Sequence, residues 1–187
     1  MDRPMLYNEY ISEHNDVIRS LTEHEQAIAK IVHLIKQCFS QKCKLMLCGN
    51  GGSAADAQHM AAEFVNRFKK ERRALPAIAL TTDSSNITSI CNDKNFKYVF
   101  SRQIEALAKP GDVLIAFSTS GNSDNIIEAI NRCNSKQVTS IAFLGKDGGK
   151  TKDQADIQVI INSQNTPRIQ EAHQLLYHII CEEVDTE

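Results

Sequence analysis

The sequence of 187 residues contains no tryptophan, four prolines and no apolar run long enough to cross a bilayer. Its polar N-terminus has no apolar segment of the kind found in secretory signal peptides. The formal net charge is −2 at pH 7, so no basic excess favours nucleic acid or an anionic membrane as a partner. The six cysteines form no C-x-x-C pair, which indicates reduced thiols rather than disulfides or a zinc knuckle. We therefore expect a cytoplasmic protein that binds neither nucleic acid nor membrane.

The sequence does contain five short apolar segments that alternate with stretches of helical spacing. This alternation is typical of an α/β protein with a doubly wound parallel sheet, and we expect the flavodoxin-like strand order 2-1-3-4-5. The length suits one domain over residues 1–187, in which residues 41–187 form the α/β core. The expected strands are 45–48, 76–81, 112–117, 138–144 and 155–161.

Residues 1–40 precede the first strand and are expected to form an N-terminal helical arm. Tyr10, Ile11, Val17 and Ile18 provide only a narrow apolar stripe in its first half. Such a stripe is compatible with a cover over the chain's own domain or with contact to another subunit.

The first strand leads into Gly49-Asn50-Gly51-Gly52-Ser53 and then a helix rich in alanine. Ser53 is the expected N-cap, and the N–H groups of the first helical turn would suit a phosphate. Within this helix His59 and Glu63 are four residues apart and share one face. Three other interpretations are a simple turn, a solvated side-chain pair, and a dinucleotide site of the G-x-G-x-x-A type with Asp83 as the ribose ligand.

A second polar loop, 118–123, follows the third strand and contains three serines and a threonine before a helix. It has no lysine, so it is not a nucleotide P-loop, but it suits a phosphate monoester. In the order 2-1-3-4-5 this loop and the glycine loop are neighbours at the point where strand order reverses. A dinucleotide-binding protein has no use for this loop or for the pair His59 and Glu63. Between the second and third expected strands, we expect a short helix at 87–90 that is interrupted at 91–93.

The last helix carries Gln170 and His178, which are eight residues apart and fall roughly 80° from each other around the axis. A buried histidine on such a helix is usually a core residue. Together, however, His59, Glu63 and His178 supply the ligand types of a zinc or similar divalent site.

Three motifs resemble those of the sugar isomerase (SIS) domain family, and more narrowly the phosphoheptose isomerases: 48–59, 118–123 and Arg168-Ile169-Gln170-Glu171. The resemblance implies conversion of D-sedoheptulose 7-phosphate to D-glycero-D-manno-heptose 7-phosphate through an enediolate. This aldose–ketose isomerisation is the first step toward the ADP-heptose of lipopolysaccharide core. It also implies a cytoplasmic homotetramer with sites near the subunit interfaces.

The resemblance further implies one zinc per subunit, held by His59, Glu63, Gln170 and His178, with Glu63 and His178 as the catalytic acid and base. Cys91 stands where the family pattern has a smaller residue. A sister branch of the family, which binds a replication initiator protein without catalysis, lacks the counterparts of Glu63 and His178, so their presence favours an enzyme. The residues implied to bind substrate are Asn50, Gly51, Gly52, Ser53, Glu63, Asn92, Asp93, Ser118, Thr119, Ser120, Ser123 and Gln170.

Overall fold

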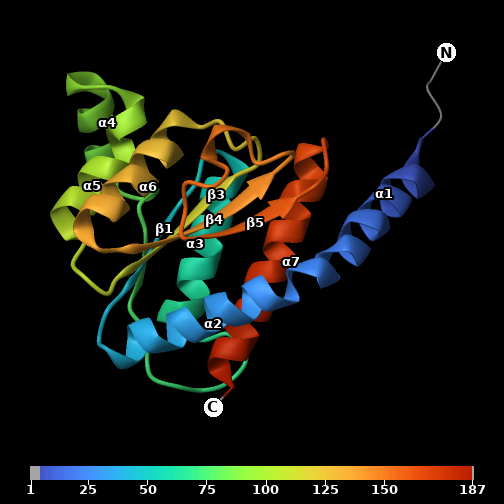
Figure 1. Ribbon diagram of the computed structural model, residues 1–187, viewed down its shortest axis with the longest axis horizontal. Helices are drawn as coiled ribbons and strands as arrows, with labels where there is room; N and C mark the ends of the chain where they lie inside the picture. Colours follow the sequence, from blue (N-terminus) through green and yellow to red (C-terminus); the bar gives the residue numbers. More distant parts are fainter. Residues whose placement is uncertain (1–4, 187) are drawn as a thin grey trace.

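The computed structural model describes residues 5–186 and has a five-stranded parallel sheet at its centre (Figure 1). The strand order is β2-β1-β3-β4-β5, so the predicted doubly wound sheet and its order are confirmed. Each strand lies within two residues of its predicted bounds at both ends. The strands are β1 (Leu45–Cys48), β2 (Ala77–Ala79), β3 (Val113–Ser118), β4 (Thr139–Gly145) and β5 (Ile157–Ile161).

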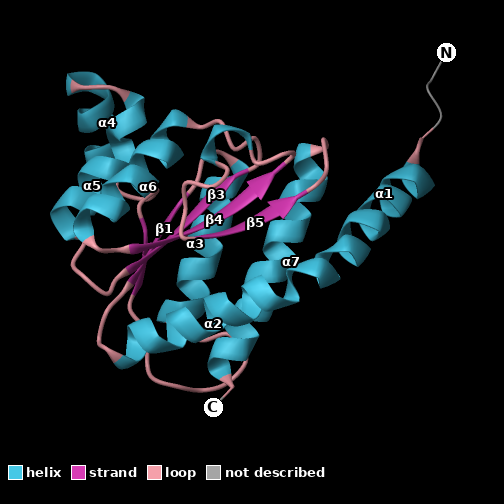
Figure 2. Cartoon of the chain, viewed as in Figure 1, coloured by secondary structure: helices cyan, strands magenta, loops and turns pink. Residues whose placement is uncertain are grey.

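Two layers of helices cover the sheet (Figure 2). On one face lie α2 (Glu25–Ser40), α3 (Gly52–Val65) and α7 (Thr166–Asp185), and on the other lie α4 (Ser84–Asp93), α5 (Val99–Leu107) and α6 (Asp124–Lys136). Short 3-10 helices occupy Leu21–His24, Phe96–Tyr98 and Gly149–Thr151. Within residues 5–186, no helix combines the length and apolar character needed to cross a membrane.

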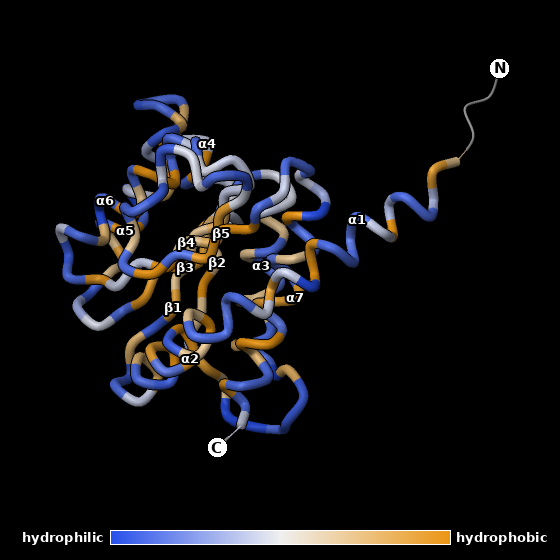
Figure 3. Tube along the Cα trace, turned by 45° about the vertical axis from the view of Figure 1, so that its right-hand side comes forward, coloured by the Kyte–Doolittle hydropathy of each residue, from blue (hydrophilic) through white to orange (hydrophobic). Residues whose placement is uncertain are grey.

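Both faces of the strands are apolar because successive side chains point into different layers. In β1, Leu45 and Leu47 pack with α2, α3 and α7, whereas Met46 and Cys48 pack with α5 and α6. All four are fully buried, which explains the uninterrupted apolar run. In Figure 3 the hydrophobic colour is accordingly concentrated along the strands.

The predicted N-terminal helix is confirmed, since α1 (Tyr7–Ser20) extends away from the body of the molecule (Figure 1), and residues 1–4 of the predicted arm lie outside the described residues. None of its residues is buried in this chain. Polar contacts hold it to the start of α7: the Arg168 guanidinium donates to the Tyr10 carbonyl at 2.7 Å, and His14 Nδ1 lies 2.7 Å from a Glu171 carboxylate oxygen. The arm therefore has a fixed direction and leaves Tyr10 and Ile11 exposed, while Val17 and Ile18 at its end are half-buried against the core of the same chain.

Two local predictions were wrong. The N-cap of α3 is Gly51, with φ of +56°, and Ser53 is buried inside the first turn. A positive φ is easy for glycine and costly for serine, so the chain enters the helix two residues earlier than the capping rule suggested. Cys91-Asn92-Asp93 does not interrupt its helix either, because α4 runs on to Asp93.

Candidate active site

The glycine loop and the serine loop lie side by side at the carboxyl ends of β1 and β3, as predicted. The side-chain amides of Asn50 and Asn125 exchange two hydrogen bonds, each of 2.9 Å, between the glycine loop and the start of α6. A cavity of about 230 Å³ opens beside this pair. Its lining consists of Asn50, Asn95, Phe96, Lys97, Ser123, Asp124 and Asn125.

The serine loop is held in a fixed shape by its own hydrogen bonds and by the β4–β5 connection. Ser118 Oγ accepts from the Gly121 N–H at 3.1 Å and donates to Ser123 Oγ at 3.3 Å. Gly121, with φ of +62°, packs so closely on Gly148 that a Cβ would collide with it. Ser123 is the N-cap of α6, and its side chain makes no capping bond within the described chain. The helix start therefore keeps donors for an anion.

A second cluster brings together His59, Glu63 and His178. His59 Nε2 lies 2.9 Å from Glu63 Oε1 across one turn of α3, and His178 approaches from α7. One potential ligand atom from each residue lies within 4.8 Å of the others. Three of the four predicted metal ligands thus converge, although 115 residues of sequence separate Glu63 from His178.

His178 carries an unused nitrogen. Its Nε2 is buried and has no hydrogen-bond partner among residues 5–186. Burial, and then the neighbouring His59, lower the pKa of His178 below its usual value, so the imidazole is neutral at pH 7. A neutral, orphaned ring nitrogen beside a carboxylate and a second imidazole is the donor set that a divalent metal requires. These residues therefore fit the predicted metal.

Gln170 lies nearer the glycine loop. A Cβ added to Gly52 would collide with the Gln170 side-chain amide, so Gln170 packs directly against the beginning of α3. It is eight residues before His178 on α7, which corresponds to about 12 Å along the helix axis. Gln170 therefore connects the glycine loop to the helix that carries His178.

Asn92 and Asp93 are absent from the lining of the cavity beside the two loops. Both are exposed on the last turn of α4, where the Asn92 amide donates to the Asp93 carboxylate at 2.8 Å. Asn95 and Phe96, which follow Asn92 and Asp93 in the chain, are among the residues that line this cavity.

Sequence reasoning missed Asn125, Asp56 and Tyr177. Tyr177 is fully buried, and its hydroxyl lies 2.9 Å from His59 Nδ1. Asp56 lies one turn before His59 on α3, and burial raises its pKa to about 6. In the sequence Tyr177 is an aromatic residue on an apolar helix and signals only a core position. Asp56 in an alanine-rich helix was the one available sign of a buried carboxyl.

Comparisons with known proteins show the family to which the chain belongs. The family model described as the SIS domain matches residues 9–145, and the chain belongs to the SIS-domain family. Phosphoheptose isomerase from Clostridium acetobutylicum is 51% identical over 165 residues, which cover 88% of this chain and 84% of that protein. Within the SIS-domain family, the chain therefore belongs with the phosphoheptose isomerases.

Solved structures of the same family have the same fold. Phosphoheptose isomerase from Neisseria gonorrhoeae is 41% identical with a TM-score of 0.85, and the match covers 98% of this chain and 100% of that one. A phosphoheptose isomerase from Francisella tularensis is 32% identical with a TM-score of 0.90, and the match covers 97% of both chains.

Proposed function

We propose that this isomerase converts D-sedoheptulose 7-phosphate to D-glycero-D-manno-heptose 7-phosphate, the first step toward the ADP-heptose of lipopolysaccharide core. The observation that carries the proposal is the convergence of His59, Glu63 and His178, the first two of which lie on the helix that begins at the glycine loop. Aldose–ketose isomerisation needs a base at carbon, an acid at oxygen and an anchor for the phosphate. These three parts are available here.

The phosphate is assigned to the serine loop. Ser118, Thr119, Ser120 and Ser123 offer hydroxyls around the N-terminus of α6, where the helix dipole and free N–H groups favour a dianion. The glycine loop faces the same space through Asn50, so a sugar anchored there extends along the start of α3. Other sugar contacts are assigned to Gly51, Gly52, Ser53, Asn92, Asp93 and Gln170.

Glu63 and His178 are assigned the proton transfers between C1 and C2. Glu63 removes the carbon-bound proton, and His178 exchanges a proton with the substrate oxygen. The neutral state of His178 supports its role, because a neutral imidazole both donates and accepts. The 2.9 Å contact with His59 fixes the direction of the Glu63 carboxylate.

One zinc per subunit is assigned to His59, Glu63, Gln170 and His178. When bound, zinc would polarise the substrate carbonyl and stabilise the negative charge that develops on the enediolate oxygens. The orphaned Nε2 of His178 supports this assignment. Glu63 cannot be a tight ligand and a free base at the same instant, so its two roles belong to different moments of the cycle.

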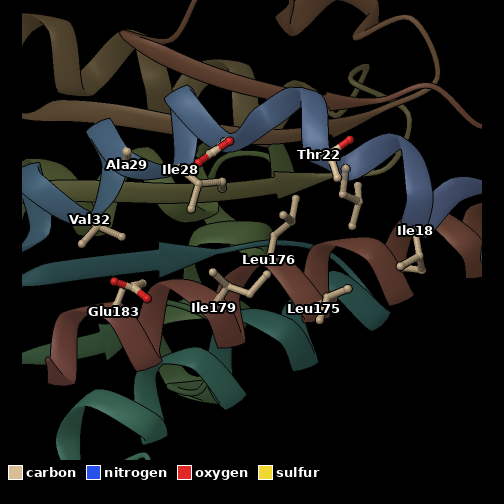
Figure 4. A pocket seen from close by; sticks show the side chains of 11 residues that line it. Ile18, Thr22, Ile28, Ala29, Val32, Leu175, Leu176, Ile179 and Glu183 are labelled. Atoms are coloured by element: carbon tan, nitrogen blue, oxygen red, sulfur yellow. The ribbon is translucent and has the colours of Figure 1, made fainter.

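A homotetramer is assigned from the apolar groove between α2 and α7. Figure 4 shows Ile28 and Val32 of α2 facing Leu176 and Ile179 of α7 across this groove, whose volume is about 700 Å³. The arm α1 ends beside it and exposes Tyr10 and Ile11. A second copy of the chain, itself carrying such an arm, is the assigned occupant, which places subunit contacts on the helix that carries His178.

The free cysteines of the described chain and the phosphorylated substrate suit a cytoplasmic location.

The decisive experiment is turnover of D-sedoheptulose 7-phosphate by the purified protein, followed by NMR in D2O. We expect the aldose product to carry deuterium at C2. In the Glu63→Gln variant, kcat should fall by ~10²–10⁴, because general base catalysis is worth that much, while substrate binding survives at the untouched serine loop. Glu105→Gln removes an exposed carboxylate on the opposite layer and should leave turnover unchanged. Turnover at the parental rate in Glu63→Gln, or none of any ketose phosphate in the parent, would refute the proposal.

A further inference from the structure

Arg72 lies in the loop that follows α3, and its guanidinium joins the ends of two helices. Nη2 donates to the Glu63 carbonyl and Nη1 to the Phe64 carbonyl, each at 2.9 Å, in the last turn of α3. Nε donates at 2.6 Å to the carboxylate of Asp185, the last residue of α7. One planar side chain therefore connects the two helices that supply the proposed metal ligands.

We propose that Arg72 is a positioning residue, which holds the end of α3 against the end of α7 and thereby sets the spacing between Glu63 and His178. Neither the motifs nor the relatives' names assign a role to Arg72. The proposal deepens the proposed function and rests on it only for the metal readout, because the spacing can be measured without metal.

The candidate site depends on this spacing because it is built from both helices. His59 and Glu63 share one face of α3 and are in contact at 2.9 Å, whereas His178 comes from α7. The other end of the helix pair is held by Gln170, which packs against Gly52. Between these two ends, the side chains of the site need placing to about 0.5 Å, the precision that a metal or catalytic group requires. The end of the pair near Glu63 therefore needs a contact of its own.

Burial distinguishes the pair of Arg72 and Asp185 from a surface ion pair. The two side chains are 16% and 2% exposed. Burial alone would raise the pKa of Asp185, but hydrogen bonds from Arg72 and from backbone N–H groups of the α3–β2 connection hold it below its usual value, so the carboxylate is charged at neutral pH. Loss of either partner leaves the other as an uncompensated buried charge. A lysine cannot replace the guanidinium, because only a planar fork reaches a carboxylate and two carbonyls at once.

The first test is a zinc titration of the metal-free protein in competition with a chelator. Arg72→Lys keeps the positive charge but lacks the fork, and Asp185→Asn keeps the shape but removes the charge that holds Arg72. Loss of a positioning partner typically lowers metal affinity about 10–100-fold, so both variants should bind zinc that much more weakly than the parent. Parental zinc affinity in either variant would overturn the proposal.

Glu182→Gln is the matched control, because it removes a carboxylate from the same end of α7. The partner of Glu182 is Lys69, at 2.7 Å, instead of Arg72. Glu182 is also four residues from His178 along α7, whereas Asp185 is seven residues away. If charge near the metal decided the affinity, the control would therefore lose at least as much as Asp185→Asn. We expect it to keep the parental affinity, and an equal loss in both variants would overturn the proposal.

The second test measures the spacing itself, through the nuclear Overhauser effect between the imidazole rings of His59 and His178 in chelator-treated protein. The ring centroids are 5.0 Å apart, and each ring's signals are identified by their loss in His59→Gln or His178→Gln. We expect the effect in the parent and in Glu182→Gln, and a weaker one or none in Arg72→Lys. Absence of the effect in the parent would overturn the proposal. An unchanged effect in Arg72→Lys, even with a lower urea midpoint, would do so too, because the ion pair would then only stabilise the fold.

This second measurement needs neither metal nor turnover. A parent that binds no zinc, or that isomerises no sugar phosphate, would count against the proposed function. The effect between His59 and His178 would still decide the role of Arg72.

Discussion

The buried carboxyl of Asp56 predicts an unusual pH dependence of stability. Its side chain is 9% exposed, and its Oδ2 has no hydrogen-bond partner within the described chain. Burial raises its pKa from 3.8 to about 6, while the neighbouring His59 opposes the shift. Between these two values the folded state binds more protons than the unfolded state, so the carboxyl adds stability as pH falls. Above pH 6 the full cost of the buried charge remains.

The magnitude follows from the two pKa values. At about 1.36 kcal/mol per pKa unit, the free energy of unfolding should rise by about 2 kcal/mol between pH 8 and pH 4 for the parent relative to Asp56→Asn, less than the whole pKa difference implies because the unfolded carboxyl is itself partly protonated at pH 4. Taking this difference cancels the titration of other groups, and the amide cannot titrate.

Urea unfolding with a chelator present, at pH values from 4 to 8, measures the difference through the midpoint and the slope m. The control variant Asp16→Asn removes a carboxylate that is 71% exposed on α1, and its curve should run parallel to that of the parent. A parent-minus-Asp56→Asn difference that stays flat over this range, or that has the opposite slope, would refute the assignment of a desolvated carboxyl.

Three further predictions concern substrate, metal and assembly. Ser120→Asp places a like charge against the substrate phosphate and should raise KM at least about tenfold. An unchanged KM would refute the assignment of the phosphate to the serine loop. Native mass spectrometry with elemental analysis should find one zinc per subunit, lost in His59→Ala, whereas a metal-free and fully active parent would contradict the metal site. Ile179→Asp should break the oligomer in sedimentation, because Ile179 is 40% exposed in the groove, and Leu107→Asp, at a position 45% exposed on α5, should not. An Ile179→Asp tetramer would place the interface elsewhere.

The strands and their order could be predicted because the physical signal is local. A strand buried on both faces has to be apolar at every position, and residues 45–48 and 113–117 are. The placement of the two polar loops then follows from the rule that ligands bind where strand order reverses. Helix boundaries were less certain, since Gly51 could cap α3 only by adopting a positive φ, which a capping rule based on serine does not consider.

The site itself was predictable only in part. His59 and Glu63 share one helix face, and four-residue spacing is visible in a sequence. His178 could be named as a candidate ligand, but its convergence with the other two could not be predicted, because its distance from α3 depends on how α7 packs. The single-domain organisation and the assigned roles of the site residues stay predictions. Asn92 and Asp93, taken from the resemblance, lie exposed on α4 and do not line the cavity beside the loops.

Tyr177 shows why part of the site lies beyond sequence reasoning. An aromatic residue on the buried side of α7 is sufficiently explained by the core, and nothing local distinguishes a tyrosine that only fills space from one whose hydroxyl also contacts a histidine. The distinction arises when α3 brings Nδ1 of His59 within 2.9 Å of the hydroxyl. Since Nδ1 is then occupied, only Nε2 is left to face Glu63. Packing of two helices thus decides which nitrogen of His59 faces Glu63, and this choice is encoded in neither motif.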